Sequence, residues 1–318
     1  MKWYTVNLNE SASTRWAHVI EDFKDDMREV VSYVDTLPFL VKLIGLPLIR
    51  TLFNQSSQVL HKDEMACTSR ITGIPVEEVF LMQFIYELTA CCTSGVINTA
   101  DGVIHYRTMD WEMPELKKLT INVRFERDGE HVFNAVTWAG SVGIFTAAKS
   151  GAHTVSINFR TTGDGIMENL TRLVSGIWPP SYLLREKMSD GCSTQSIIDS
   201  LTHTPTVSPC YFIIASTVAE ESVIIARSRQ GADKIVRMGD QTHIVQTNVD
   251  DEDEEDSPNI LYSKERICEF RRMVHDKYFE GMSDEAILKY FDVFPLTNET
   301  TLYRCVMRPG EGTITTRV

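Results

Sequence analysis

Cys92 is the first residue whose type and setting could support chemistry. It stands where a helix-rich segment gives way to alternating, β-branched residues, and a tight turn near residues 99–101 follows it. This pattern predicts a hairpin in which Cys92 lies opposite Arg107. A guanidinium next to a thiol favours the thiolate, which is the nucleophilic form. The pair therefore predicts a nucleophilic site, and the alternative is a buried packing cysteine.

Two further residues of the return strand are candidates for the same site. Arg107 and Asp110 are three apart, so on a regular strand they point to opposite faces. We expect both to reach Cys92 only where the strand ends or bulges near Met109. His105 supports a different hypothesis, a conventional thiol–imidazole pair with Cys92 in an uncleaved chain.

The elements before this hairpin are mostly helical, after a strand-like start at residues 4–7. Apolar residues recur at helical spacing over 16–33, and another helical run covers 75–88. The apolar stretch 37–53 has about the length of a membrane span, but it contains two prolines, a lysine and an arginine, which are costly in lipid. We expect either a pair of short core helices there or an apolar lip that contacts membrane or lipid.

From Cys92 onward the pattern changes to short alternating segments joined by turns. We expect strands over 92–97, 103–108, 119–125, 131–135, 143–147, 154–159, 211–216, 222–227 and 243–247, and helices over 167–177 and 193–201. Helices, strands, helices and strands in this order predict an α+β protein with packed layers.

The composition is that of an ordinary globular protein with one large or two small domains. The chain has 318 residues, of which 43% are hydrophobic and 24% charged, and its net charge is −13. Such acidity disfavours nucleic-acid binding. Seven acidic residues form the run 250–256, which we expect to be a solvated surface loop.

Cofactor and disulfide motifs are not found in the sequence. The seven cysteines include no C-x-x-C pair and no metal-like grouping with histidine, and no phosphate-binding glycine motif occurs. We therefore expect no metal, nucleotide or other organic cofactor.

The cellular compartment stays open between cytoplasmic and secretory or lysosomal. The first residues do not form a secretory signal, whereas four N-x-S/T sequons favour the secretory route, at Asn9, Asn54, Asn169 and Asn298.

Several motifs in the same order resemble the family of acid ceramidase and its relative N-acylethanolamine acid amidase. They are Tyr86-Glu87 with Cys92-Thr93-Ser94, Arg107 with Asp110, Val132-Phe133 with Ala139-Gly140 and Val142-Gly143, and Val245-Gln246-Thr247-Asn248 with Asp250. The similarity runs from Tyr4 to about Met307 and so covers nearly the whole chain.

The resemblance implies an N-terminal-nucleophile hydrolase, an αββα sandwich whose precursor cuts itself just before the nucleophile. Carried onto this chain, the cut falls between Cys91 and Cys92. It leaves a helical α part, residues 1–91, and a catalytic β part, residues 92–318, which we expect to stay associated. The new α-amine of Cys92, with a pKa of about 7.7–8, can then act as general base beside its own thiol.

The resemblance also implies roles for four residues. Cys92 attacks the amide carbonyl, Asp110 binds and orients the α-amine of Cys92, and Arg107 keeps the surroundings of the nucleophile electropositive. Asn248 helps to stabilise the oxyanion with its side-chain amide.

Three positions depart from the family pattern. Leu261 stands where the first family arginine falls, and Arg266 nearby is out of register, so the arginine's role is not assigned to it. Phe159 replaces an acidic residue, and Cys91 precedes the nucleophile where a larger apolar residue is usual.

The implied activity is hydrolysis of a lipid amide. The leading substrate is ceramide, which gives sphingosine and a fatty acid, because Thr72–Pro75 and Ser208–Ile213 are closer to acid ceramidase. Hydrolysis of an N-acylethanolamine is the alternative. A non-catalytic lipid-binding relative is a further hypothesis, which Leu261 and Phe159 motivate and the retained nucleophile set opposes.

Overall fold

The computed structural model describes residues 1–32, 43, 45–84, 90–160, 168–169, 172–173, 175–250 and 260–318. Some expected features lie wholly or partly outside these residues. They are the beginning of the apolar stretch 37–53, the end of the helical run 75–88 with Tyr86-Glu87, parts of the helix expected over 167–177, and the acidic run after Asp250.

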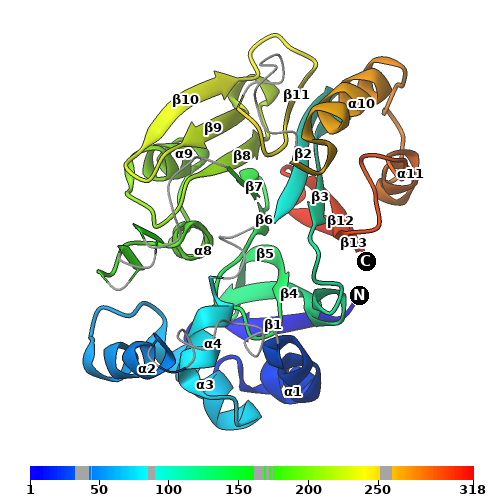
Figure 1. The fold of residues 1–318 in the computed structure, drawn as a ribbon. Helices are drawn as coiled ribbons and strands as arrows, with labels where there is room; N and C mark the ends of the chain where they lie inside the picture. The colour runs from blue at the N-terminus through cyan, green and yellow to red at the C-terminus, as the bar shows by residue number, and fades with distance from the viewer. Residues whose placement is uncertain are drawn as a thin grey trace.

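Two β-sheets form the centre of the described part of the chain (Figure 1). The larger has eight strands in the order β1-β4-β5-β6-β7-β8-β9-β10, and the smaller has five, in the order β11-β2-β3-β12-β13. Neighbouring strands are antiparallel except β1 and β4, which run parallel. The bounds in the larger sheet are β1 Trp3–Asn7, β4 Thr120–Arg127, β5 Glu130–Trp138, β6 Thr146–Lys149, β7 His153–Phe159, β8 Cys210–Ser216, β9 Val223–Arg227 and β10 Ala232–Arg237. Those in the smaller sheet are β11 His243–Gln246, β2 Cys91–Thr99, β3 Gly102–Asp110, β12 Thr301–Arg308 and β13 Thr313–Arg317.

Helices cover the outer faces of both sheets, which gives an αββα sandwich and confirms the α+β prediction. The helix α9 packs on β8 and β9, α10 packs on β2 and β11, and α11 packs on β12 and β13. The helices are α1 Ala17–Val31, α2 Leu46–Gln55, α3 Lys62–Thr72, α4 Val76–Met82, α6 Leu116–Leu119, α8 Pro180–Ser189, α9 Thr194–His203, α10 Ser263–His275 and α11 Asp284–Tyr290, with short 3-10 turns at Ala219–Glu221 and Ile260–Tyr262.

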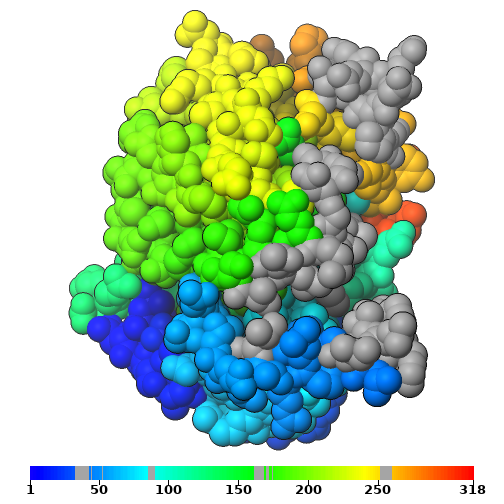
Figure 2. Space-filling model, turned by 60° about the vertical axis from the view of Figure 1, so that its left-hand side comes forward, coloured from blue at the N-terminus to red at the C-terminus, as the bar shows by residue number. Residues whose placement is uncertain are grey.

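Residues 1–91 are built into the same core as the rest of the chain. β1 extends the larger sheet, pairing with β4 from Trp3 opposite Asn122 to Asn7 opposite Glu126. In Figure 2 this N-terminal segment, in blue, forms the lower end of the face shown and lies directly against later parts of the chain. Residues 1–91, the expected α part, thus contribute a strand to the larger sheet.

A glycine lets α10 approach the smaller sheet closely. The ring of Phe270 occupies the space that a Cβ atom at Gly95 would take. Any larger residue at position 95 would therefore push the helix away from β2. The same helix carries Arg266, whose position depends on this close contact. Gly95 thus links strand packing to the geometry of the site.

Candidate active site

The β2–β3 hairpin brings Cys92 and Arg107 together, with a register that differs from the prediction. Cys92 lies opposite Met109, and Arg107 lies opposite Ser94. The prediction of Cys92 opposite Arg107 was wrong because the two turn residues follow Thr99, which shifts the pairing. Cys92 and Arg107 still share one face of the hairpin, and Arg107 Nη2 lies 3.4 Å from Cys92 Sγ.

Backbone and hydroxyl oxygens of the opposite sheet hold the Arg107 side chain. It is fully buried and donates to the carbonyls of Phe145 and Ile157, the latter at 2.8 Å, and to Thr146 Oγ1 at 2.5 Å. Its guanidinium also lies over the Tyr303 ring. These contacts fix a positive charge beside the Cys92 sulfur.

Asp110 lies on the other face of the hairpin. The ladder between β2 and β3 stays regular up to Cys91 opposite Asp110, so of the two expected conditions the strand ends next to Met109, at Asp110, and does not bulge there. The irregularity is instead in β12, between Thr301 and Tyr303. Because the strand stays regular, Asp110 and Arg107 flank Cys92 from opposite faces of the hairpin.

The Asp110 carboxylate is part of a buried polar cluster. Thr301 donates to it at 2.6 Å, and Arg266 Nη1 lies 3.2 Å from Asp110 Oδ2, with both charged side chains fully buried. Burial raises the pKa of Asp110, and the positive charge of Arg266 and the hydrogen bond from Thr301 oppose this rise. Arg266 therefore favours the charged form of this carboxylate.

Arg266 is a residue of this cluster to which the sequence alone assigned no role. Its Nη1 also donates to Thr93 Oγ1 at 3.1 Å, and its Nη2 donates to Asn248 Oδ1 at 3.1 Å. A signal exists in the sequence, because Arg266 falls on the apolar face of α10 with Ile267 and Phe270. A charged side chain on a buried helix face needs a polar or oppositely charged partner. The position of Arg266 in the helical pattern therefore indicates a buried polar site.

Asn248 connects this cluster to the Cys92 backbone. Its Oδ1 accepts the Cys92 N–H at 2.9 Å, and its Nδ2 donates to the Phe159 carbonyl at 2.8 Å. The structure thus brings together all four residues predicted for the site, Cys92, Arg107, Asp110 and Asn248. Asn248 contacts the very nitrogen that would become the α-amine.

His105 does not pair with Cys92. It is fully buried, and its ring nitrogens hydrogen-bond to Thr154 at 2.8 Å and Ser156 at 3.0 Å. Burial, with a smaller effect of Arg107, lowers the pKa of His105 to about 3, so the ring is neutral. The hypothesis of a Cys92–His105 pair is wrong.

Neighbouring thiols are unsuited to the same role. Burial raises the pKa of Cys91 to about 12 and that of Cys305 to about 12, so both stay protonated. The Cys92 sulfur, by contrast, lies 3.4 Å from the Arg107 guanidinium. All cysteines are free of disulfides, and in the described ranges no group of three or more His, Cys, Asp or Glu residues could hold a metal ion.

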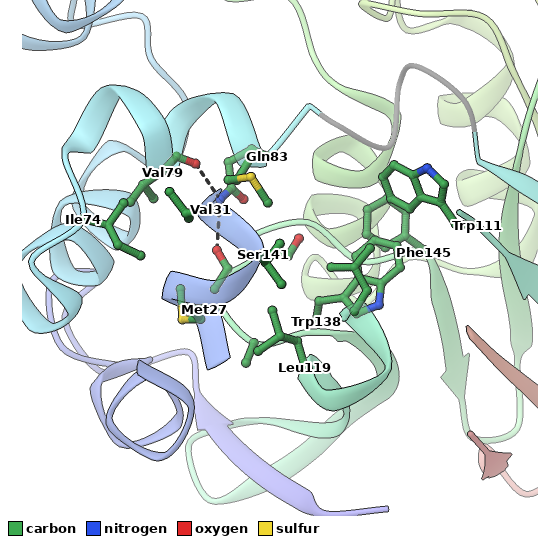
Figure 3. Close-up of a pocket in the computed structure, with 15 residues that line it drawn as sticks. Met27, Val31, Ile74, Val79, Gln83, Trp111, Leu119, Trp138, Ser141 and Phe145 are labelled. Atoms are coloured by element: carbon green, nitrogen blue, oxygen red, sulfur yellow. Dashed lines mark hydrogen bonds between the residues drawn. The ribbon is translucent and has the colours of Figure 1, made fainter. Parts of the chain in front are cut away.

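An apolar pocket lies next to the site (Figure 3). Its empty space, with the open mouth included, is about 560 Å³. Phe145, whose carbonyl binds Arg107, and Trp111, which follows Asp110, form the end nearest the site. The lining is otherwise Met27, Val30, Val31, Ile74, Val79, Met82, Gln83, Leu116, Leu119, Trp138, Ala139, Gly140 and Ser141.

Cys92 itself is closed off from solvent. Its side chain is fully buried, and the preceding residues Ala90 and Cys91 are also buried.

Part of the apolar stretch 37–53 is described, and there Leu43 and Leu48 are exposed. Among the described residues, no helix is both long enough and apolar enough to cross a membrane.

Comparison with known proteins gives relatives along most of the chain. A family model for the beta subunit of N-acylethanolamine-hydrolyzing acid amidase matches residues 1–54. The N-acylethanolamine-hydrolyzing acid amidase of Caenorhabditis elegans is 27% identical over 96% of this chain and 89% of its own length. Acid ceramidase of Bos taurus is 26% identical over 98% of this chain and 84% of its own. An uncharacterized protein of Acanthamoeba polyphaga mimivirus is 27% identical over 95% of this chain and 94% of its own.

A solved structure shares the fold. The C. elegans N-acylethanolamine-hydrolyzing acid amidase ortholog superposes with a TM-score of 0.59 and 26% identity, covering 69% of this chain and 93% of the other. Two facing sheets between helices, with a cysteine at the start of an inner strand, define the class of N-terminal-nucleophile hydrolases. Within that class, the chain is similar over nearly its whole length to acid ceramidase and to N-acylethanolamine-hydrolyzing acid amidase.

Proposed function

We propose that this chain is a lipid amidase that cleaves itself between Cys91 and Cys92 and then hydrolyses the amide bond of ceramide. One observation carries the proposal. The Cys92 thiol contacts the Arg107 guanidinium, while the Cys92 backbone nitrogen is held by Asn248. A residue with both its nucleophile and its prospective base held in place is what this chemistry requires.

Self-cleavage would use the Cys92 thiol against the carbonyl carbon of Cys91. Attack forms a thioester and breaks the peptide C–N bond, and the proton passes to the Cys92 nitrogen. Water then hydrolyses the thioester, which leaves a carboxylate on Cys91 and a free thiol and amine on Cys92. The high pKa of the buried Cys91 thiol supports Cys92 as the attacking residue.

Turnover of a lipid amide would repeat these steps on an external carbonyl. The Cys92 amine takes the thiol proton and later gives it to the leaving amine, which for ceramide is sphingosine. Asn248 and the Asp110–Arg266 pair lie around that nitrogen, which supports their role in orienting it. Loss of an oxyanion donor such as the Asn248 amide costs about 100- to 1000-fold in rate.

The acyl chain is proposed to lie in the apolar pocket of Figure 3, whose near end borders Arg107 and Asp110. Exposed Leu43 and Leu48 support a peripheral contact of the stretch 37–53 with a membrane or lipid aggregate. The pairing of β1 with β4 supports continued association of residues 1–91 with residues 92–318 after the cut.

The proposal is tested by intact mass. Wild type, Cys92→Ala and Cys91→Ala are incubated at mildly acidic and neutral pH and compared. We expect wild type and Cys91→Ala to split before residue 92 and Cys92→Ala to stay whole. Cys91→Ala is the matched control because it removes the adjacent thiol and keeps the nucleophile. A wild type that never splits overturns the mechanism and favours the non-catalytic, lipid-binding hypothesis. A Cys92→Ala chain that splits also overturns the mechanism, because Cys92 is then not the cleaving nucleophile.

Hydrolysis of an N-acylethanolamine is the second candidate function. The family model and the superposed structure both carry the name of that amidase, which favours it. The two substrates share one mechanism and differ in the leaving amine. Parallel rates of release of palmitate from palmitoyl-sphingosine and palmitoyl-ethanolamine by the cleaved protein decide between them.

A further inference from the structure

Asn248 lies just beyond the end of a strand and is held in place by contacts from other elements. It comes two residues after Gln246, the last residue of β11, so the β-ladder does not itself fix its side chain. A donor or acceptor must sit within a fraction of an ångström of its working position to be effective. Whatever holds residues 246–250 therefore controls the site.

The end of β7 supplies the first two contacts to this segment. Asn158 Nδ2 donates to the carbonyls of Gln246 at 2.9 Å and Thr247 at 3.3 Å. The carbonyl of the next residue, Phe159, accepts from Asn248. Because β7 belongs to the larger sheet and β11 to the smaller, these bonds join the two sheets at the site.

The third contact is an ion pair between the next residue, Arg160, and Asp250. It is bidentate, with Arg160 Nε 2.6 Å from Oδ1 and Nη2 2.7 Å from Oδ2. Tyr211 donates to the same Oδ1 at 2.5 Å, and its ring lies under the guanidinium. Asp233 of β10 binds the remaining Arg160 nitrogen. Planar bidentate pairs define orientation as well as distance.

The pair is sheltered enough to hold a defined geometry. Arg160 and Tyr211 are buried, and Asp250 is half-exposed. Burial acts to raise the pKa of Asp250, but hydrogen bonds from Arg160 and Tyr211 hold it below its ordinary value. Asp250 is therefore charged across the whole range in which the Cys92 amine titrates.

We propose that Arg160 and Asp250 are positioning residues that set Asn248 against the backbone nitrogen of Cys92. The effect of these two residues on catalysis rests on the proposed function, whereas their positioning of Asn248 does not. Phe159, which departs from the family pattern, takes part only through its backbone. The next residue, Arg160, carries the charge that holds residues 246–250 in place.

The test compares Asp250→Asn and Arg160→Lys with Asp284→Asn. Asp284 is a matched control, because it likewise binds an arginine, Arg308 at 2.7 Å, and accepts from a hydroxyl, that of Thr315. It joins α11 to β12 and β13, away from Asn248. We expect Asp250→Asn to lower kcat for the lipid amide about 10- to 100-fold with little change in KM, and Arg160→Lys to retain part of the rate. Asp284→Asn should keep the wild-type kcat.

The pH profile gives a signature that a purely structural role would not move. Asn248 Oδ1 accepts from the Cys92 nitrogen, which favours the protonated amine. Loosening Asn248 should lower the amine pKa, so the acidic limb of kcat/KM should move to lower pH in Asp250→Asn and not in Asp284→Asn. A fall in kcat without this movement, or an equal fall in both variants, overturns the proposal.

Hydrogen exchange separates this inference from the proposed function. In uncleaved Cys92→Ala chains, the amide of residue 92 should exchange at least about tenfold faster with Asp250→Asn than with Asp284→Asn. An inactive wild type refutes the proposed function, yet exchange still decides whether Asp250 positions Asn248. Equal exchange at residue 92 in the two variants overturns the positioning role.

Discussion

Glu64 and Arg185 form a buried ion pair across the boundary between residues 1–91 and 92–318. Arg185 Nη2 lies 2.7 Å from Glu64 Oε1, both side chains are almost fully buried, and Trp16 donates to the same carboxylate at 2.9 Å. A pair of this kind is costly to break, because one charge remains buried without its partner.

Glu64→Gln should therefore destabilise the chain by about 3–5 kcal/mol. Urea unfolding of the uncleaved Cys92→Ala chain measures this without interference from cleavage. The control is Glu29→Gln, since Glu29 and Lys118 form a half-exposed pair across the same boundary and should contribute less than about 1 kcal/mol. Equal losses in the two variants would show that the buried pair does not hold the parts together.

The stability of the chain should fall in acid because of His61. Burial, assisted by Arg185, lowers the pKa of His61 from 6.5 to about 4. Below pH 6.5 the unfolded chain takes up a proton that the folded chain refuses, so stability is lost as pH falls from 6.5 towards 4 and is constant for this group above 6.5.

His61→Asn should reduce this acid sensitivity. Asparagine tolerates the left-handed backbone at this position, where φ is 53°. From pH 7 to pH 4 the variant should lose up to about 3 kcal/mol less than wild type in urea titrations. His275→Asn removes an exposed imidazole and serves as the control. Parallel pH curves for wild type and His61→Asn would refute this assignment.

Arg266 should be needed for the charge of Asp110. Arg266→Met removes the cation with the largest effect on the buried carboxylate and leaves only the weaker effect of Arg107, which raises the pKa of Asp110 further. We expect slower self-cleavage, with its acidic limb displaced to higher pH, and partial recovery in Arg266→Lys. Intact mass against time at several pH values measures both effects. An unchanged limb in Arg266→Met would separate Arg266 from Asp110 in function.

The pocket should set the acyl-chain length. Val31 is partly buried and contributes to the lining from α1. Val31→Trp should fill part of the pocket and lower kcat/KM for long-chain amides about tenfold or more, with little effect on short chains. Val31→Ala leaves the space open and is the matched control. A uniform loss over all chain lengths would point instead to damage to the fold.

Much of the fold could be predicted from local pattern. Alternation over short segments predicted β2 to β5, β7 to β9 and β11, while β6 begins at Thr146 and not at Gly143. Turn residues located the hairpins, but one residue of error in a turn moves every partner along the ladder. The misplaced partner of Cys92 is an example.

Arg266 and the Arg160–Asp250 pair could not be assigned because they depend on tertiary packing. Arg266 reaches the site only because α10 lies on Gly95, and no spacing along the chain encodes that contact. Arg160 and Asp250 are 90 residues apart and meet only where the two sheets converge. Residue type and burial pattern reveal that such charges need partners, but not which partners.

The place of β1 at the end of the larger sheet has a consequence for producing the protein in pieces. Without β1, one side of β4 would present unpaired N–H and C=O groups to solvent. Such bare strand edges recruit other chains and lead to aggregation. Residues 92–318 expressed alone should therefore be insoluble, and co-expression of residues 1–91 should rescue them, so the N-terminal part serves as a built-in chaperone for its own sheet.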